Sequence, residues 1–234
     1  MCTVVFIPQQ GKYILASLRD EDPKREKASK PILRDTPINF IAPIDPQGGG
    51  TWVGINEIGT AIILLNGAFV NHVKKESYKQ SRGTIVTALL TVDDAIAYWN
   101  ALSIENIEPF TLIVWCKKNL WQFVWDGSTK YNLQLDNTQP YIWSSSTLYN
   151  VTEKKIRQEK FEYWMTMEVM KNQESLLSFF KNCKNEEDTV FIKNTENIQT
   201  HSYTSIVIDS EKEHSLSYHD LISETIHRQP IQIL

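Results

Sequence analysis

The fold is decided by the start of the chain, which reads CTVVFI at residues 2–7, PQQG at residues 8–11 and YILASLRDE at residues 13–21. Two short apolar runs around a turn that contains glycine predict a β-hairpin. A hairpin returns the chain to its starting point, so Arg19 and Asp20 are expected to lie within a few residues of Cys2. The rest of the sequence is interpreted outward from this hairpin.

Cys2 is the first candidate catalytic residue. Removal of Met1, which is usual before a small side chain, would leave a thiol and a free α-amine on the same residue. An unperturbed α-amine titrates at about 8 and a thiol at about 8.5, so each can serve the other near neutral pH. This is the chemistry of an N-terminal nucleophile. The alternative is that Cys2 is a small apolar residue at the start of an edge strand.

Arg19 and Asp20 are candidates because the hairpin brings them back to the N-terminus. An arginine nearby favours the thiolate form of a cysteine, and a carboxylate can orient an α-ammonium group. The alternative is an ordinary polar strand end followed by an acidic turn.

Composition limits the class of protein. The chain has 234 residues, of which 41% are hydrophobic and 22% charged, which predicts a single domain over residues 1–234 with a sizeable core. A net charge of −4, without a face rich in lysine and arginine, argues against a nucleic-acid partner. The three cysteines are widely spaced and form no CxxC pair, which is typical of a reducing compartment. No secretory signal is visible and no apolar run approaches the roughly 18 residues of a transmembrane segment, so we expect a cytoplasmic protein.

The remaining pattern predicts hairpins and helices in alternation. Hairpins are expected over residues 51–65 and 110–125 and a closing strand pair over 203–218. Helices are expected in two stretches after Ser81 and again over 152–171 and 173–183, with a capping box at residues 91–94. Residues 22–37 are charged and punctuated by proline, which indicates an exposed loop, and the tail 222–234 is left unassigned. Helices that cover antiparallel sheets give an α+β fold, a four-layer αββα sandwich.

Asn66 is a candidate for stabilising an oxyanion. It follows the apolar run Ala61–Leu65, and its side-chain NH₂ could donate to a developing negative charge. The alternative is that Asn66 and Gly67 simply form a turn. The glycines at 48–50 precede no Lys-Ser/Thr pair and no helix, so a tight turn or backbone room beside a substrate is favoured over phosphate binding.

Several motifs together resemble one known family. They are Cys2-Thr3, Ser17–Pro23, Gly49–Asn56, Leu65–Gly67 and Ser81–Gly83. In this combination the chain resembles the NRDE family, that of transport and Golgi organisation protein 2, over almost its whole length. One position departs from the pattern, because Leu18 stands where the Asn-Arg-Asp-Glu signature has asparagine.

The resemblance implies an N-terminal-nucleophile hydrolase fold with two antiparallel sheets between helix layers, similar to the choloylglycine hydrolase and penicillin V acylase group. By that comparison Cys2 would be the nucleophile, Asp20 would orient the α-amine and Asn66 would stabilise the oxyanion. Arg19 completes the candidate catalytic residues. Trp52 and Ser145 are the candidate substrate-binding residues, and Ser145 falls near a second asparagine of that group.

Two functions follow from these residues. The first is hydrolysis of a non-peptide amide or a thioester through an acyl-Cys2 intermediate, without a metal or other cofactor. The second is non-catalytic binding and trafficking of haem or an acyl-CoA-like ligand on the same fold, which the family association suggests. The five histidines are scattered, so no haem ligand can be named.

Overall fold

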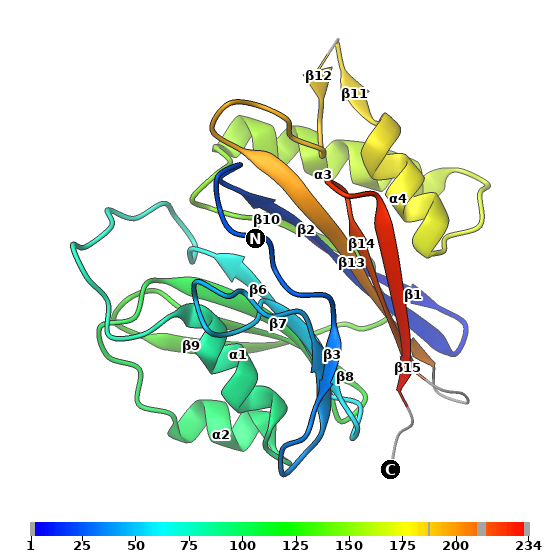
Figure 1. Ribbon diagram of the computed structural model, residues 1–234. Helices are drawn as coiled ribbons and strands as arrows, with labels where there is room; N and C mark the ends of the chain where they lie inside the picture. The colour runs from blue at the N-terminus through cyan, green and yellow to red at the C-terminus, as the bar shows by residue number, and fades with distance from the viewer. Residues whose placement is uncertain (1–2, 187, 210–213, 232–234) are drawn as a thin grey trace.

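A computed structural model describes residues 3–186, 188–209 and 214–231 (Figure 1). Within these ranges the chain forms two large antiparallel sheets and four helices. We call the six-stranded sheet, which contains the N-terminal hairpin, sheet A, and the seven-stranded one sheet B. A small separate hairpin is formed by β11 (Lys184–Asn185) and β12 (Asp188–Thr189).

Sheet A is built around the predicted N-terminal hairpin. Its strands in spatial order are β10 (Tyr141–Ser144), β1 (Thr3–Gln9), β2 (Lys12–Glu21), β13 (Gln199–Asp209), β14 (His214–Asp220) and β15 (Thr225–Ile231). The hairpin is confirmed, since Thr3 pairs with Leu18 and the register continues to Gln9 and Lys12. The predicted closing pair is confirmed as β13 and β14.

Sheet B contains the second and third predicted hairpins. Its strands in spatial order are β3 (Ile32–Arg34), β4 (Phe40–Ala42), β5 (Val53–Asn56), β6 (Ala61–Asn66), β7 (Phe110–Cys116), β8 (Asn119–Trp125) and β9 (Lys130–Leu135). The apolar run of β6 is buried because this strand pairs with β5 and β7 and is covered on both faces.

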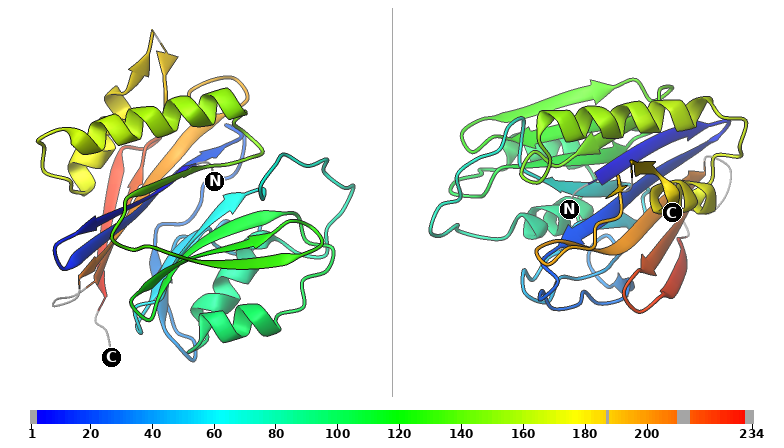
Figure 2. Two further views of the ribbon diagram at one scale, coloured as in Figure 1. Left: turned by 180° about the vertical axis from the view of Figure 1, so that it is seen from behind. Right: turned by 90° about the horizontal axis from the view of Figure 1, so that it is seen from above.

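The helices lie on the outer faces of the two sheets, as Figures 1 and 2 show. α3 (Val151–Thr166) and α4 (Gln173–Asn182) cover sheet A, and α1 (Arg82–Leu90) and α2 (Ala95–Ala101) cover sheet B. Alternation along β1 separates two cores: Val5 packs in the helix-side cluster and Phe6 in the cluster between the sheets. The four-layer αββα sandwich is confirmed. No helix in the described ranges has the length and apolar character of a membrane span.

Four strands lie where the sequence did not predict them: the two-residue strands β11 and β12, and β3 and β15 in the large sheets. β3 interrupts the expected loop over 22–37, where Ile32 and Leu33 pair with Ala42 and Ile41. It is a three-residue edge strand between prolines, so its alternation is too short to detect. β15 occupies the unassigned tail and forms the edge of sheet A beside β14.

The helices differ from the prediction at their ends. α3 stops at Thr166 instead of residue 171, because Met167 adopts an extended conformation. The capping box expected at residues 91–94 is replaced by a single cap in which the Asp94 carboxylate accepts from the amides of Ile96 and Ala97.

Candidate active site

The first described residue, Thr3, lies between two strands that lead to candidate site residues. Cys2, the predicted nucleophile, lies outside the described residues. Thr3 pairs with Leu18 of β2 on one side and with Ser144 of β10 on the other. The candidates Arg19 and Asp20 directly follow Leu18, and the candidate Ser145 directly follows Ser144.

Asp20 is buried and held by two hydroxyl donors. The Tyr149 hydroxyl donates to one carboxylate oxygen over 2.8 Å, and the Thr200 hydroxyl donates to the other over 2.6 Å. Only 2% of the residue is exposed. Two short hydrogen bonds from different parts of the chain fix the orientation of the carboxylate. Asp20 is therefore a rigidly placed acceptor beside the start of β1.

Arg19 points the other way, because successive residues of a strand face opposite sides of a sheet. Its guanidinium carbon lies 4.5 Å from the centre of the Trp52 ring. One terminal nitrogen lies 3.4 Å from the Glu21 carboxylate and 3.7 Å from that of Asp45, and the other is 3.4 Å from His201 Nδ1. Burial and the charge of Arg19 lower the pKa of His201. Arg19 thus faces sheet B, on the side opposite to the Asp20 carboxylate.

A second arginine, Arg25, pairs with the same two carboxylates. Arg25 forms a 2.6 Å ion pair with Asp45 and lies 3.7 Å from Glu21. Burial opposes ionisation of Asp45, but the hydrogen bond and the charge of Arg25 hold the pKa of its carboxyl group below the usual value. The two arginines and two carboxylates form one network.

Asn66 ends β6 next to Ser145. The Ser145 hydroxyl donates to the backbone carbonyl of Asn66 over 2.8 Å, which ties the end of sheet B to the end of β10 in sheet A. Gly67 follows with a positive φ of 81°, so the predicted turn is present. The side-chain amide of Asn66 makes no hydrogen bond within the described ranges, which leaves its NH₂ available as a donor.

Two cavities meet at Asn66. The apolar cavity, of about 270 Å³, is lined by residues that include Asn66, Phe69, Ile142, Trp143 and Ser145. The polar cavity, of about 160 Å³, is lined by residues that include Arg19, Trp52, Asn66, Lys74 and Arg82. At the polar cavity the buried Trp52 Nε1 has no hydrogen-bond acceptor in the described part of the chain, and the Arg19 nitrogen that faces Glu21 and Asp45 makes ion pairs with them but no hydrogen bond. Four of the five described candidates therefore line these cavities, namely Arg19, Trp52, Asn66 and Ser145. The carboxylate of Asp20 lies on the opposite face of β2.

A close backbone contact forms one wall of the polar cavity. Gly50, which precedes β5, lies against Gly83 in the first turn of α1, and the amide of Thr51 donates to the Gly83 carbonyl over 3.3 Å. A Cβ built on Gly50 would lie 2.3 Å from the Gly83 carbonyl carbon. The backbone room expected from the glycine run thus accommodates α1, and Arg82 beside this contact pairs with Glu108 at 3.1 Å.

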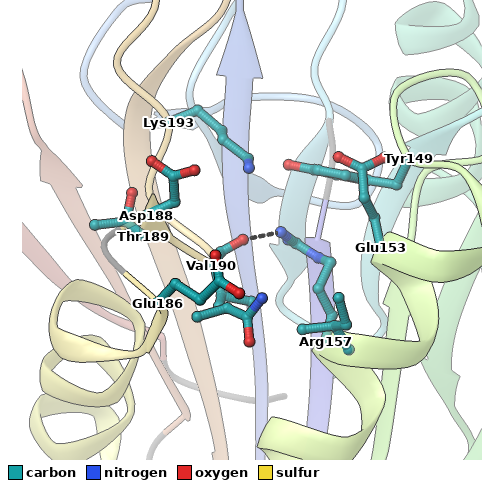
Figure 3. A pocket seen from close by; sticks show the side chains of 10 residues that line it. Tyr149, Glu153, Arg157, Glu186, Asp188, Thr189, Val190 and Lys193 are labelled. Carbon is teal, nitrogen blue, oxygen red and sulfur yellow. Dashed lines mark hydrogen bonds between the residues drawn. The ribbon is translucent and has the colours of Figure 1, made fainter.

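Sequence reasoning missed the residues that support the site from the helix side. Arg157 of α3 is buried and donates to the hydroxyls of Thr3 and Ser144 and to the Val190 carbonyl, as Figure 3 shows for Val190. Its guanidinium carbon lies 4.0 Å from the centre of the ring of Tyr149, the same tyrosine that donates to Asp20. The sequence does contain a pattern that could have identified Arg157. It lies four and seven residues before the buried aromatics Phe161 and Trp164, so it shares their face of the helix.

One protein-family model matches almost the whole chain. The family model described as Transport and Golgi organisation 2 matches residues 1–221. None of the curated proteins matches the chain significantly.

Solved structures with the same fold share little sequence. A C2A mutant of the conjugated bile acid hydrolase from Clostridium perfringens has a TM-score of 0.61 at 9% identity, covering 98% of this chain and 92% of that one. The Caenorhabditis elegans orthologue of N-acylethanolamine-hydrolyzing acid amidase has a TM-score of 0.61 at 10% identity, with coverages of 88% and 92%. Penicillin V acylase from Agrobacterium tumefaciens scores 0.49 at 13% identity, with coverages of 100% and 87%. The first two show that the fold is that of the N-terminal-nucleophile hydrolases.

Proposed function

The chain belongs to the Transport and Golgi organisation 2 family, and from that membership and the site geometry we propose that it is an N-terminal-cysteine hydrolase. Its substrate would be a small non-peptide amide or thioester. The reaction would proceed through an acyl group on Cys2 after removal of Met1. No step needs a metal or another cofactor.

One observation carries the proposal: the start of β1 lies between a fixed carboxylate and a side-chain amide that makes no hydrogen bond in the described part of the chain. Asp20 is held by two hydroxyls on the β2 side, and Asn66 is tied through Ser145 to the β10 side. The peptide bond keeps the Cα of residue 2 about 3.8 Å from that of Thr3. We expect a nucleophile on the residue before Thr3 to act between these two groups.

The chemistry follows from the types of group present. The Cys2 thiolate attacks the carbonyl carbon, and the Asn66 amide donates to the resulting oxyanion. The C–N or C–S bond then breaks as the leaving group takes a proton from the α-ammonium, which the Asp20 carboxylate orients. Water attacks the acyl-Cys2 carbonyl, the α-amine accepts its proton, and the acid product leaves with the thiolate restored.

The two cavities support a division of the substrate at the reacting carbonyl. The apolar cavity, beside Ser145, suits a short acyl group, and the polar cavity offers donors from Arg19 and Trp52 to the leaving group. One of the structurally similar proteins is named an N-acylethanolamine-hydrolyzing acid amidase, which supports an amide as the class of substrate. Ligand pockets commonly enclose about 300–1,000 Å³, so cavities below that range favour a small acyl substrate over a haem-sized ligand.

The experiment reads acylation of Cys2 by mass spectrometry. The protein is incubated with p-nitrophenyl butyrate, an activated acyl donor, and the intact mass and N-terminal peptide are measured. We expect Met1 to be absent and one butyryl group on Cys2, and none in Cys2→Ala. Cys116 is an internal reference, since burial raises its thiol pKa to about 11 and prevents reaction near neutral pH.

Two results would end the hydrolase proposal: retention of Met1, or butyrylation that persists in Cys2→Ala. The non-catalytic carrier of haem or an acyl-CoA-like ligand would then be the remaining candidate. A haem titration without a saturable Soret shift would remove its haem version. We also expect a cytoplasmic protein, because Cys116 and Cys183 are both free thiols in the fold.

A further inference from the structure

An exposed apolar patch lies on the segment that connects β6 to α1. Within loop 67–81, Phe69 is 57% exposed, Val70 74% and Val73 93%. The rings of Phe69 and Tyr131 are nearly perpendicular, with their centres 5.2 Å apart, and this contact joins the loop to exposed side chains of β9. We define the loop patch as Phe69, Val70, Val73, Tyr131 and Leu133. Single exposed apolar residues are normal, but five on one loop and the strand beside it indicate an interaction site.

The loop is held in this conformation by hydrogen bonds. His72 Nε2 lies 3.2 Å from the Glu108 carboxylate, and the backbone amide of Lys79 donates to the Asn106 carbonyl over 2.8 Å. The amide of Lys75 donates to the Tyr78 hydroxyl over 3.0 Å. These hydrogen bonds therefore hold Val73 exposed to solvent, although burial of an apolar side chain would lower the free energy.

The charge of this loop is opposite to that of the chain. Lys74, Lys75 and Lys79 are exposed and Glu76 is the one acidic residue between Gly67 and Ser81, whereas the whole chain carries −4. Figures 1 and 2 show the loop projecting outward from the side of sheet B. Protruding apolar side chains among lysines match a surface that is apolar within and negatively charged outside.

We propose that the loop patch docks the protein on a lipid bilayer that carries anionic headgroups. Val70 and Val73 enter the headgroup region, and the lysines contact the negative charge. A bilayer accepts protruding side chains without a shaped groove, and charge complementarity selects anionic lipid. This docking is independent of any reaction at Cys2.

Docking would bring the apolar cavity to the bilayer surface. Phe69 belongs to the loop patch and also lines that cavity. Leu133 pairs in register with Gln122, another residue of the cavity wall. An apolar ligand could then pass from the bilayer to the cavity without crossing water.

Flotation with vesicles tests the proposal. The full chain is mixed with vesicles of phosphatidylcholine alone or of phosphatidylcholine with phosphatidylserine, at low and physiological salt. We expect the chain to float with the anionic vesicles, more strongly at low salt. Val73→Asp should weaken binding by about tenfold or more, and Lys75→Gln by about fivefold, the equivalent of about 1 kcal/mol for one lysine near a charged membrane.

The matched control is Val151→Asp, at an 84% exposed valine at the start of α3. It makes the same change of charge and should bind vesicles like the wild type, with urea unfolding confirming that both variants fold. Absence of wild-type flotation with anionic vesicles at low salt would overturn the proposal, as would equal binding by Val73→Asp and Val151→Asp. A change in oligomeric state in Val73→Asp, with vesicle binding unchanged, would show a protein interface and overturn it too.

Discussion

The contact between Gly50 and Gly83 predicts that alanine at position 50 is costly. Its Cβ would lie 2.3 Å from the Gly83 carbonyl carbon and 2.6 Å from both the Gly83 oxygen and the Thr84 nitrogen. Ordinary contact begins near 3.4 Å, so the loop and α1 would have to separate by about 1 Å. Overpacking of this kind costs about 1–3 kcal/mol, and weakening of the Thr51 to Gly83 hydrogen bond adds about 1 kcal/mol. We expect Gly50→Ala to lower the free energy of unfolding by about 2–4 kcal/mol.

The assay is urea denaturation of the purified protein, followed by tryptophan fluorescence and circular dichroism. Gly49→Ala is the matched control on the neighbouring residue. A Cβ on Gly49 would meet nothing within 4 Å, but its φ of +67° is unfavourable for alanine. That strain costs about 1–2 kcal/mol. The difference between the two variants isolates the clash with α1 from the backbone conformation.

A cost of Gly50→Ala equal to or below that of Gly49→Ala would refute this reasoning. It would mean that the loop before β5 moves away from α1 without loss, and the polar cavity would then lack a fixed wall. Gly83→Ala approaches the same contact from the other side, with its Cβ 2.9 Å from the Thr51 carbonyl oxygen. Its cost should be smaller, because alanine is favoured over glycine inside a helix by about 1 kcal/mol.

Two further predictions concern buried polar groups. Arg157→Met should lower the free energy of unfolding by about 2–4 kcal/mol, since it leaves the acceptors on Thr3, Ser144 and Val190 without their donor. The control Lys155→Met, on the exposed side of α3, should cost less than about 0.5 kcal/mol. Equal urea midpoints for the two variants would contradict this prediction. Burial lowers the pKa of His214, whose Nδ1 accepts from the Asp209 amide. As pH falls below about 6.5, the imidazole is protonated in the unfolded state before it is protonated in the folded state, so the free energy of unfolding decreases on acidification. His214→Asn should show a smaller decrease when urea titrations at two pH values are compared. An unchanged decrease would exclude His214 as a cause of the pH dependence.

The fold was predictable because its signals are local. The turn at Gly11 and the apolar runs on either side of it were enough to predict the β1–β2 hairpin, and the buried run of β6 predicted a strand between two neighbours. β3 could not be found in this way, since a three-residue edge strand is defined by its partner β4 and not by its own pattern. The same holds for β15, whose burial pattern is almost entirely exposed.

The candidate site was predictable where one hairpin or one turn brings residues together. Arg19 and Asp20 return beside Thr3 through the register of β1 and β2. Tyr149 and Thr200 were missed, because they reach Asp20 from 129 and 180 residues away along the chain. No pattern within a sequence window contains contacts of that length.

The departure at Leu18 is explained by strand alternation. Leu18 and Asp20 face the helix side of sheet A, and Arg19 faces sheet B. Leu18 is fully buried in the apolar cluster beneath α3 and α4, where an asparagine amide would need its own hydrogen-bond partners. The leucine therefore adds apolar burial to that core and removes no group from the two cavities, which lie on the opposite face. The proposed chemistry needs Arg19, Asp20 and Asn66, and the substitution at position 18 leaves all three in place.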